Sequence, residues 1–140
     1  MTDTEVLALF YQVFETANAV FTNWMAIITA MLVASYFFAP KISRKMAVLV
    51  LAVFSAFCLG YANELVNVYS DLAEIAAEMV RISMQEGSSL AWHPLVKSGS
   101  ESPLSVAPNV MTGMSIFAYV SCLVFFFLSR RNNWAEPKIS

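Results

Sequence analysis

Amide and carboxylate side chains collect near one end of the second apolar stretch of this sequence. Their spacing of three or four residues places them along one face of a helix. Oxygen ligands on one face could bind a divalent cation, or could concentrate cations at the mouth of a pore. Together with one asparagine of the first apolar stretch, this polar layer comprises Asn23, Glu64, Asn67, Asp71, Glu74 and Glu78.

A plainer interpretation fits the same residues. The asparagines and Glu64 would hydrogen-bond between neighbouring helices, since polar groups that face lipid are costly. The three acids further along would form a solvated face, with Arg81 paired to Glu78 three residues before it. We favour this interpretation, because three carboxylates on one helix rarely enclose an ion without partners.

Residues suited to catalysis or to holding a cofactor are scarce. His93 is the one histidine of the chain, so a bis-histidine haem is excluded, and no Glu-x-x-His pair for di-iron chemistry occurs. Phosphate-binding glycine loops and the Gly-x-Ser-x-Gly sequence of hydrolases are also missing. We therefore expect no enzymatic activity and no cofactor. Basic residues are too few for a nucleic-acid surface, so we expect no nucleic-acid partner.

Three apolar stretches define the architecture. Of the 140 residues, 59% are hydrophobic and 13% are charged, and this charged fraction is about half that of a soluble domain. A helix needs roughly 20 apolar residues to cross a bilayer, and residues at about 19–39, 46–65 and 109–128 meet this requirement. The sequence predicts an all-α integral membrane protein, with residues 1–140 as a single domain of three transmembrane helices in contact with lipid.

Basic residues indicate on which side of the membrane each connecting segment lies. Six of the eight fall between the first two stretches and after the third, namely Lys41, Arg44, Lys45, Arg130, Arg131 and Lys138. Because cytoplasmic loops are enriched in Lys and Arg, these two segments should be cytoplasmic. We expect a multi-pass protein of a bacterial inner membrane, with its N-terminus outside and its C-terminus in the cytoplasm.

The first two helices should be much longer than the bilayer is thick. The first would run over residues 4–38, with Thr4 as its N-cap and Pro40 ending it. The second would begin near Ser43 and continue to about residue 85, since one glycine and no proline interrupts it. A short loop joins them, so they should form an antiparallel hairpin that extends beyond the membrane on the outer side. Residues 86–107 should form an irregular periplasmic loop.

Small residues recur every fourth position in the first two membrane helices. Helices in lipid associate mainly by close packing, which small side chains permit. Counted from the shared loop, the two sets fall at matching depths, so they predict a helix-packing seam inside the hairpin. The seam comprises Ala26, Ala30, Ala34, Ala52, Ala56 and Gly60.

A second apolar stripe continues along the second helix outside the membrane. Its members alternate in steps of three and four, as in a coiled coil: Leu65, Val68, Leu72, Ile75, Met79 and Ile82. Exposure of this stripe to water would be costly, so it predicts a stalk interface that needs a cover. The first helix should cover about four of its six turns. The outer two would need a neighbouring subunit, another protein, or residues 87–107 folding back.

Assembly is the function that these features favour. We expect a small non-enzymatic inner-membrane protein, either a homo-oligomer or an accessory subunit that binds another membrane protein through its periplasmic helical stalk. The alternative is a homo-oligomeric pore or ion channel, with the polar layer as an acidic outer vestibule.

Overall fold

The structure, a computed structural model, describes residues 1–85, 87–97 and 103–134. Within these ranges 87% of the residues are helical and no strand occurs. Three helices are long and apolar enough to cross a membrane. The predicted all-α class and the three helices of membrane-spanning length are therefore confirmed.

Helix α1 extends over Asp3–Phe37 and begins with a capping box. The Thr2 hydroxyl accepts a hydrogen bond from the Glu5 amide at 3.3 Å, and the Glu5 carboxylate accepts one from the Thr2 amide at 2.8 Å. These two bonds satisfy amides that have no partner within the helix. The prediction of Thr4 as N-cap is wrong by two residues, because only Thr2 has an acid three positions after it to complete the box.

Helix α2 extends over Arg44–Ser83 and begins near Ser43, as predicted. The Ser43 hydroxyl caps it by accepting a hydrogen bond from the Met46 amide at 3.2 Å. Its 40 residues span about 60 Å at ~1.5 Å per residue, against roughly 30 Å for the hydrocarbon core of a bilayer.

The connection from α2 to the last long helix contains more helical structure than predicted. It includes the short helices η1 (Leu90–Trp92), α3 (Pro94–Lys97) and η2 (Pro103–Val106). Helix α4 then extends over Ala107–Asn132, with Pro108 in its first turn. A proline is tolerated there because the first amides of a helix have no intrahelical partner.

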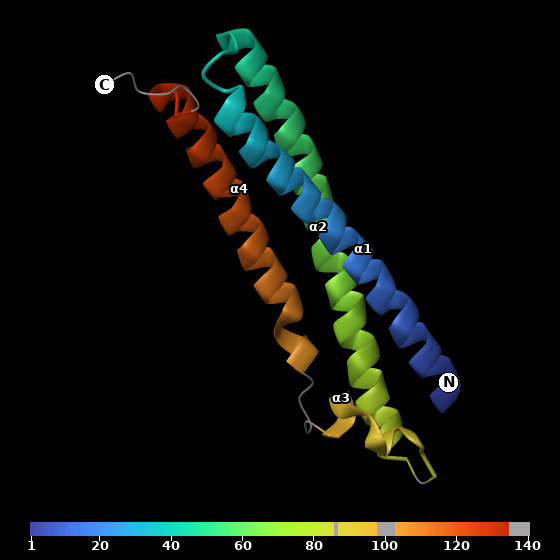
Figure 1. Ribbon diagram of the computed structural model, residues 1–140. Helices are drawn as coiled ribbons and strands as arrows, with labels where there is room; N and C mark the ends of the chain where they lie inside the picture. Colours follow the sequence, from blue (N-terminus) through green and yellow to red (C-terminus); the bar gives the residue numbers. More distant parts are fainter. Residues whose placement is uncertain (86, 98–102, 135–140) are drawn as a thin grey trace.

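Helices α1 and α2 run antiparallel and lie side by side, and α4 packs beside them (Figure 1). Helices α1 and α2 both continue past the start of α4, and η1 and α3 lie next to the far end of α2. At the opposite end, the Arg130 guanidinium of α4 donates hydrogen bonds to the carbonyls of Ala39 and Ile42 at 3.2 and 2.9 Å. These bonds attach α4 to the turn between α1 and α2.

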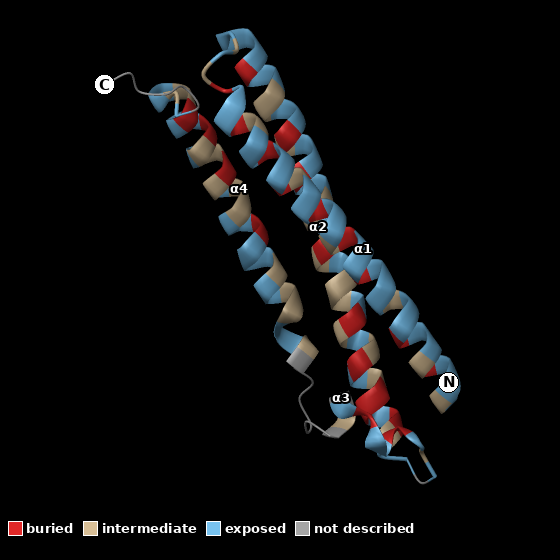
Figure 2. Ribbon diagram, viewed as in Figure 1, coloured by how far each residue is buried: buried red, intermediate tan, exposed pale blue. Residues whose placement is uncertain are grey.

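The buried side chains form two clusters. The first lies where α1, α2 and α4 meet, and Trp24, Phe54 and Phe126 are its largest members. The second surrounds Leu72 and Met79 at the far end of the α1–α2 pair. Figure 2 shows buried positions continuing along α2 beyond the start of α4. The part of the molecule outside the predicted membrane spans thus has its own apolar core.

Candidate functional site

The predicted stalk interface lies inside the single chain. Leu65, Leu72 and Met79 are fully buried, Ile82 is 3% exposed, and the other two members of the stripe are partly buried. Its outer turns contact the beginning of α1 and helix η1, which contribute Val6, Phe10 and Leu90 to the same cluster. Of the three covers expected for the outer turns, the structure shows the connection after α2 folding back, with Leu90 packed in the cluster. The stripe therefore gives no reason to expect a partner protein at this end.

A carboxylate holds this cover in place. Asp3, at the start of α1, accepts hydrogen bonds from the Ser89 amide at 2.6 Å, the Ser89 hydroxyl at 2.9 Å and the Ser88 hydroxyl at 3.2 Å. These bonds attach the turn after α2 to α1, directly before the buried Leu90. The hydrogen bond from the Ser89 amide, followed by that from its hydroxyl, lowers the pKa of Asp3 below its ordinary value of 3.8.

Substitution of Asp3 by alanine should make the protein less stable at neutral pH but not in acid. A lowered pKa means that the ionised carboxylate stabilises the fold above the unfolded-state pKa of about 4, and that this contribution is lost as the pH falls through the folded-state value. The melting temperatures of the wild type and Asp3→Ala should therefore differ at pH 7 and converge below about pH 3. Asp71→Ala, at an exposed acid of α2, is the control. Equal effects of the two substitutions at pH 7 would contradict the role of Asp3.

The predicted helix-packing seam does not lie between α1 and α2. Ala26, Ala30, Ala52, Ala56 and Gly60 are exposed, and only the remaining member, Ala34, is partly buried. A Cβ added at Gly60 would meet no atom within 4 Å in the described part of the chain, apart from its own turn of helix. Larger side chains fill the contact instead, contributed from α1 by Trp24, Ile28 and Met31 and from α2 by Phe54 and Leu65. Ala52, Ala56 and Gly60 thus face outward from α2, whereas Ala30 and Ala34 line a groove between α1 and α2. The prediction of a seam inside the hairpin is corrected accordingly.

Helix α2 therefore has two opposite faces of different character. The buried face carries the apolar stripe. The other face has small residues in its first half and polar residues in its second half. We call this second surface the exposed face of α2, and it comprises Ala52, Ala56, Gly60, Glu64, Asn67, Asp71 and Glu74. All seven residues are exposed, and their spacing of three or four residues keeps them in line.

The polar layer is not assembled into an enclosed site. Asn23 on α1 is exposed, as are Glu64 and Asn67 on α2, and no hydrogen bond joins the two helices through them in the part of the chain that the structure describes. Glu78 pairs with Arg81, whose Nε donates to its carboxylate at 2.7 Å. This hydrogen bond lowers the pKa of Glu78. The described residues contain no group of three His, Cys, Asp or Glu that could hold a metal ion.

Comparison with known proteins does not assign the chain to a family. It matches no protein-family model, no curated protein and no solved structure. Its function must therefore be argued from the exposed face of α2 and from the other surfaces of the molecule.

Sequence reasoning missed Asp3 and Arg130, which connect distant segments. Asp3 bonds to a residue 86 positions away, and Arg130 to carbonyls 88 and 91 positions away. Neither pairing has a local sequence signal, although an acid in the first turn of α1 and a basic residue in the last turn of α4 are both typical of helix ends.

Proposed function

We propose that this chain is a non-enzymatic accessory subunit of a bacterial inner-membrane complex, which binds another membrane protein through the exposed face of α2. Helices α1, α2 and α4 would cross the membrane, with the N-terminus outside and the C-terminus in the cytoplasm. The observation that carries the proposal is the alignment of exposed small residues with exposed acids on one face of α2.

The exposed apolar side chains support this placement in the membrane. Phe57 on α2 is 58% exposed and Phe117 on α4 is 75% exposed, and both lie within the apolar stretches. Many other large apolar side chains of these helices are exposed in the same way. Such a surface is costly in water and ordinary in lipid. The basic residues near the α1–α2 turn and the end of α4 support the cytoplasmic position of that end.

The small residues of the exposed face suit a helix of a partner. Ala52, Ala56 and Gly60 repeat every four residues, which is the spacing that lets two membrane helices approach closely. Because a Cβ placed at Gly60 would meet no described atom within 4 Å beyond its own turn of helix, a partner helix has room to pack there. The small residues of α2 can thus still pack closely against a helix, but that helix would belong to another protein and not be α1.

The charges on the same face favour a different protein over a second copy. Glu64 lies at the end of the apolar stretch and Asp71 and Glu74 lie beyond it, and all three are exposed and continue the line of small residues. A symmetric contact between two copies of this face would bring their carboxylates together, and facing like charges oppose association. A partner with basic residues just outside its membrane helix would meet them favourably. We therefore propose a heteromeric complex.

Replacement of Gly60 by leucine should remove the complex and leave the subunit folded. The added side chain would block close approach of a partner helix, while within the chain it meets open space. Gly113→Leu is the matched control, because Gly113 on α4 also has open space around it. Leucine is favoured over glycine in a helix by roughly 1 kcal/mol, so neither variant should lose thermal stability. The mass of the complex, extracted from native membranes in mild detergent, is the measurement.

The outcomes of this mass measurement distinguish the alternatives. A heteromeric complex that is lost in Gly60→Leu and kept in Gly113→Leu supports the proposal, whereas a monomer in native membranes contradicts it. A homo-oligomer would favour the second candidate function, a pore whose acids surround a water-filled axis. That pore should conduct cations in planar bilayers, with a smaller current in Glu64→Gln.

A further inference from the structure

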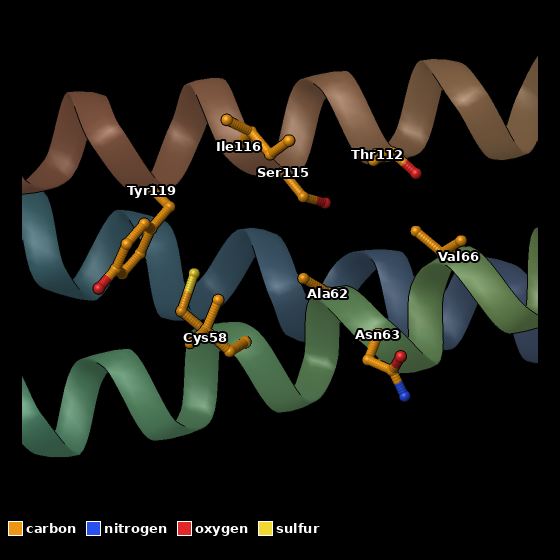
Figure 3. Close-up of a pocket in the computed structure, with 9 residues that line it drawn as sticks. Cys58, Ala62, Asn63, Val66, Thr112, Ser115, Ile116 and Tyr119 are labelled. Carbon is orange, nitrogen blue, oxygen red and sulfur yellow. The ribbon is translucent and has the colours of Figure 1, made fainter.

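A pocket of about 370 Å³ lies between α2 and α4, within the apolar stretches of both helices. Its size is at the lower end of the range for ligand pockets, roughly 300–1,000 Å³. The α2 wall includes Leu59, Ala62 and Asn63, and the α4 wall includes Thr112, Ser115 and Ile116. Figure 3 shows these two walls facing each other, with Tyr119 at the end opposite Thr112. The pocket is separate from the exposed face of α2.

One polar group in this pocket has no partner. Ser115 is 6% exposed, its hydroxyl points from α4 toward α2, and within the described part of the chain it makes no hydrogen bond. The neighbouring hydroxyls are satisfied: that of Thr112 donates to the Pro108 carbonyl at 2.9 Å, and that of Tyr119 shares a hydrogen bond with Ser55 at 2.8 Å. A buried polar group without a partner is unfavourable. The enclosed Ser115 hydroxyl gains a partner if its side chain rotates toward an occupant of the pocket.

The walls of the pocket carry polar and apolar side chains together. Thr112 and Val66 lie at one end, Ser115 and Ala62 in the middle and Tyr119 and Cys58 at the other end. Two apolar side chains that line it, Leu59 and Ile116, are 56% and 61% exposed, so the pocket opens toward the space that lipid would fill. An occupant with a polar end and a long apolar tail matches both properties.

We propose that the pocket binds one acyl chain of a phospholipid, with the Ser115 hydroxyl donating a hydrogen bond to the ester carbonyl of that chain. The lipid belongs to the leaflet on the side of the α1 N-terminus, which is the outer leaflet in the orientation proposed above. A phospholipid fits because it joins a polar ester group to a long apolar tail, and the pocket places Ser115 beside the apolar side chains of Leu59 and Ile116. The acyl chain then extends past Leu59 and Ile116 toward the middle of the membrane.

Photochemical labelling in nanodiscs tests this site. The purified chain is reconstituted in phosphatidylcholine that contains a small fraction of phosphatidylcholine with a diazirine in one acyl chain, and the adducts are mapped by mass spectrometry. We expect them to concentrate on Ala62, which is only partly exposed, and on Leu59 and Ile116. Val120 and Val124 on α4 are 50% and 51% exposed and lie outside the pocket, so they report ordinary surface lipid.

Two variants separate a specific site from general contact with lipid. Ser115→Ala keeps the shape of the pocket and removes the hydrogen bond, so labelling of Ala62 should fall about three- to tenfold. Ala62→Phe fills the pocket and should abolish the excess labelling of Ile116, while Val120→Phe, outside the pocket, should leave it unchanged. Adducts distributed by exposure alone would overturn the proposal. Undiminished labelling of Ala62 in Ser115→Ala would overturn the role of the hydroxyl.

Discussion

Leu72→Ala should lower the free energy of unfolding of the isolated chain by about 2–5 kcal/mol. Leu72 is fully buried in the cluster formed by the outer parts of α1 and α2 and by η1. This cluster lies beyond the apolar stretches, so its unfolding exposes apolar surface to water. The substitution therefore loses both the transfer free energy of the removed atoms and the packing around the cavity that they leave. Chemical denaturation in detergent, followed by circular dichroism, measures the loss.

The control for this substitution is Leu9→Ala. Leu9 lies in the outer part of α1, whereas Leu72 lies in the outer part of α2, and Leu9 is 37% exposed. Its truncation therefore creates no enclosed cavity and should lower the free energy of unfolding by well under half as much as Leu72→Ala. Equal and small effects would show that the stripe is not buried within one chain. In that case a partner protein would have to cover it, and the accessory function would depend on the stalk and not on the exposed face of α2.

Hydrophobic length and periodicity made the helices predictable. A run of apolar residues long enough to cross a bilayer is a local property, and so is the alternation of three and four that places Leu65, Leu72 and Met79 on one face. Both patterns belong to the helix itself, so they do not depend on what the helix packs against. The cap of α1 was missed by two residues because two threonines, Thr2 and Thr4, stand near its start, although the spacing of Thr2 and Glu5 is the local pattern of a capping box.

The packing partner of each face could not be predicted in the same way. Ala52, Ala56 and Gly60 show that some helix can approach closely, but their spacing is the same whether that helix belongs to this chain or to another. The structure places Trp24 and Phe54 in the contact between α1 and α2, and these large side chains leave the small residues outside. The pocket beside Ser115 could not be predicted from the sequence either, since it depends on how α4 lies against α2.

Trp24→Ala should destabilise the cluster where α1, α2 and α4 meet by about 3 kcal/mol, the lower end of the range for truncation of a buried aromatic. Trp24 is 1% exposed and is the largest fully buried side chain of the described residues. It packs in the cluster that joins α1, α2 and α4. In lipid the transfer term is small, because the surroundings are as apolar as the protein interior, so the loss comes mainly from the packing contacts around the cavity. Thermal unfolding in nanodiscs measures it.

The matched control is Trp92→Ala in η1. Trp92 is 60% exposed, so removal of its side chain leaves no enclosed cavity and should change the melting temperature little. Comparison of Trp24→Ala with Leu72→Ala also separates the two cores, because Trp24 belongs to the cluster of the three long helices and Leu72 to the outer one. If Trp24→Ala melts only the three-helix cluster while Leu72→Ala melts only the outer one, the two unfold as separate units. A single shared transition for both variants would instead show that α1 and α2 transmit stability from one cluster to the other along their continuous length.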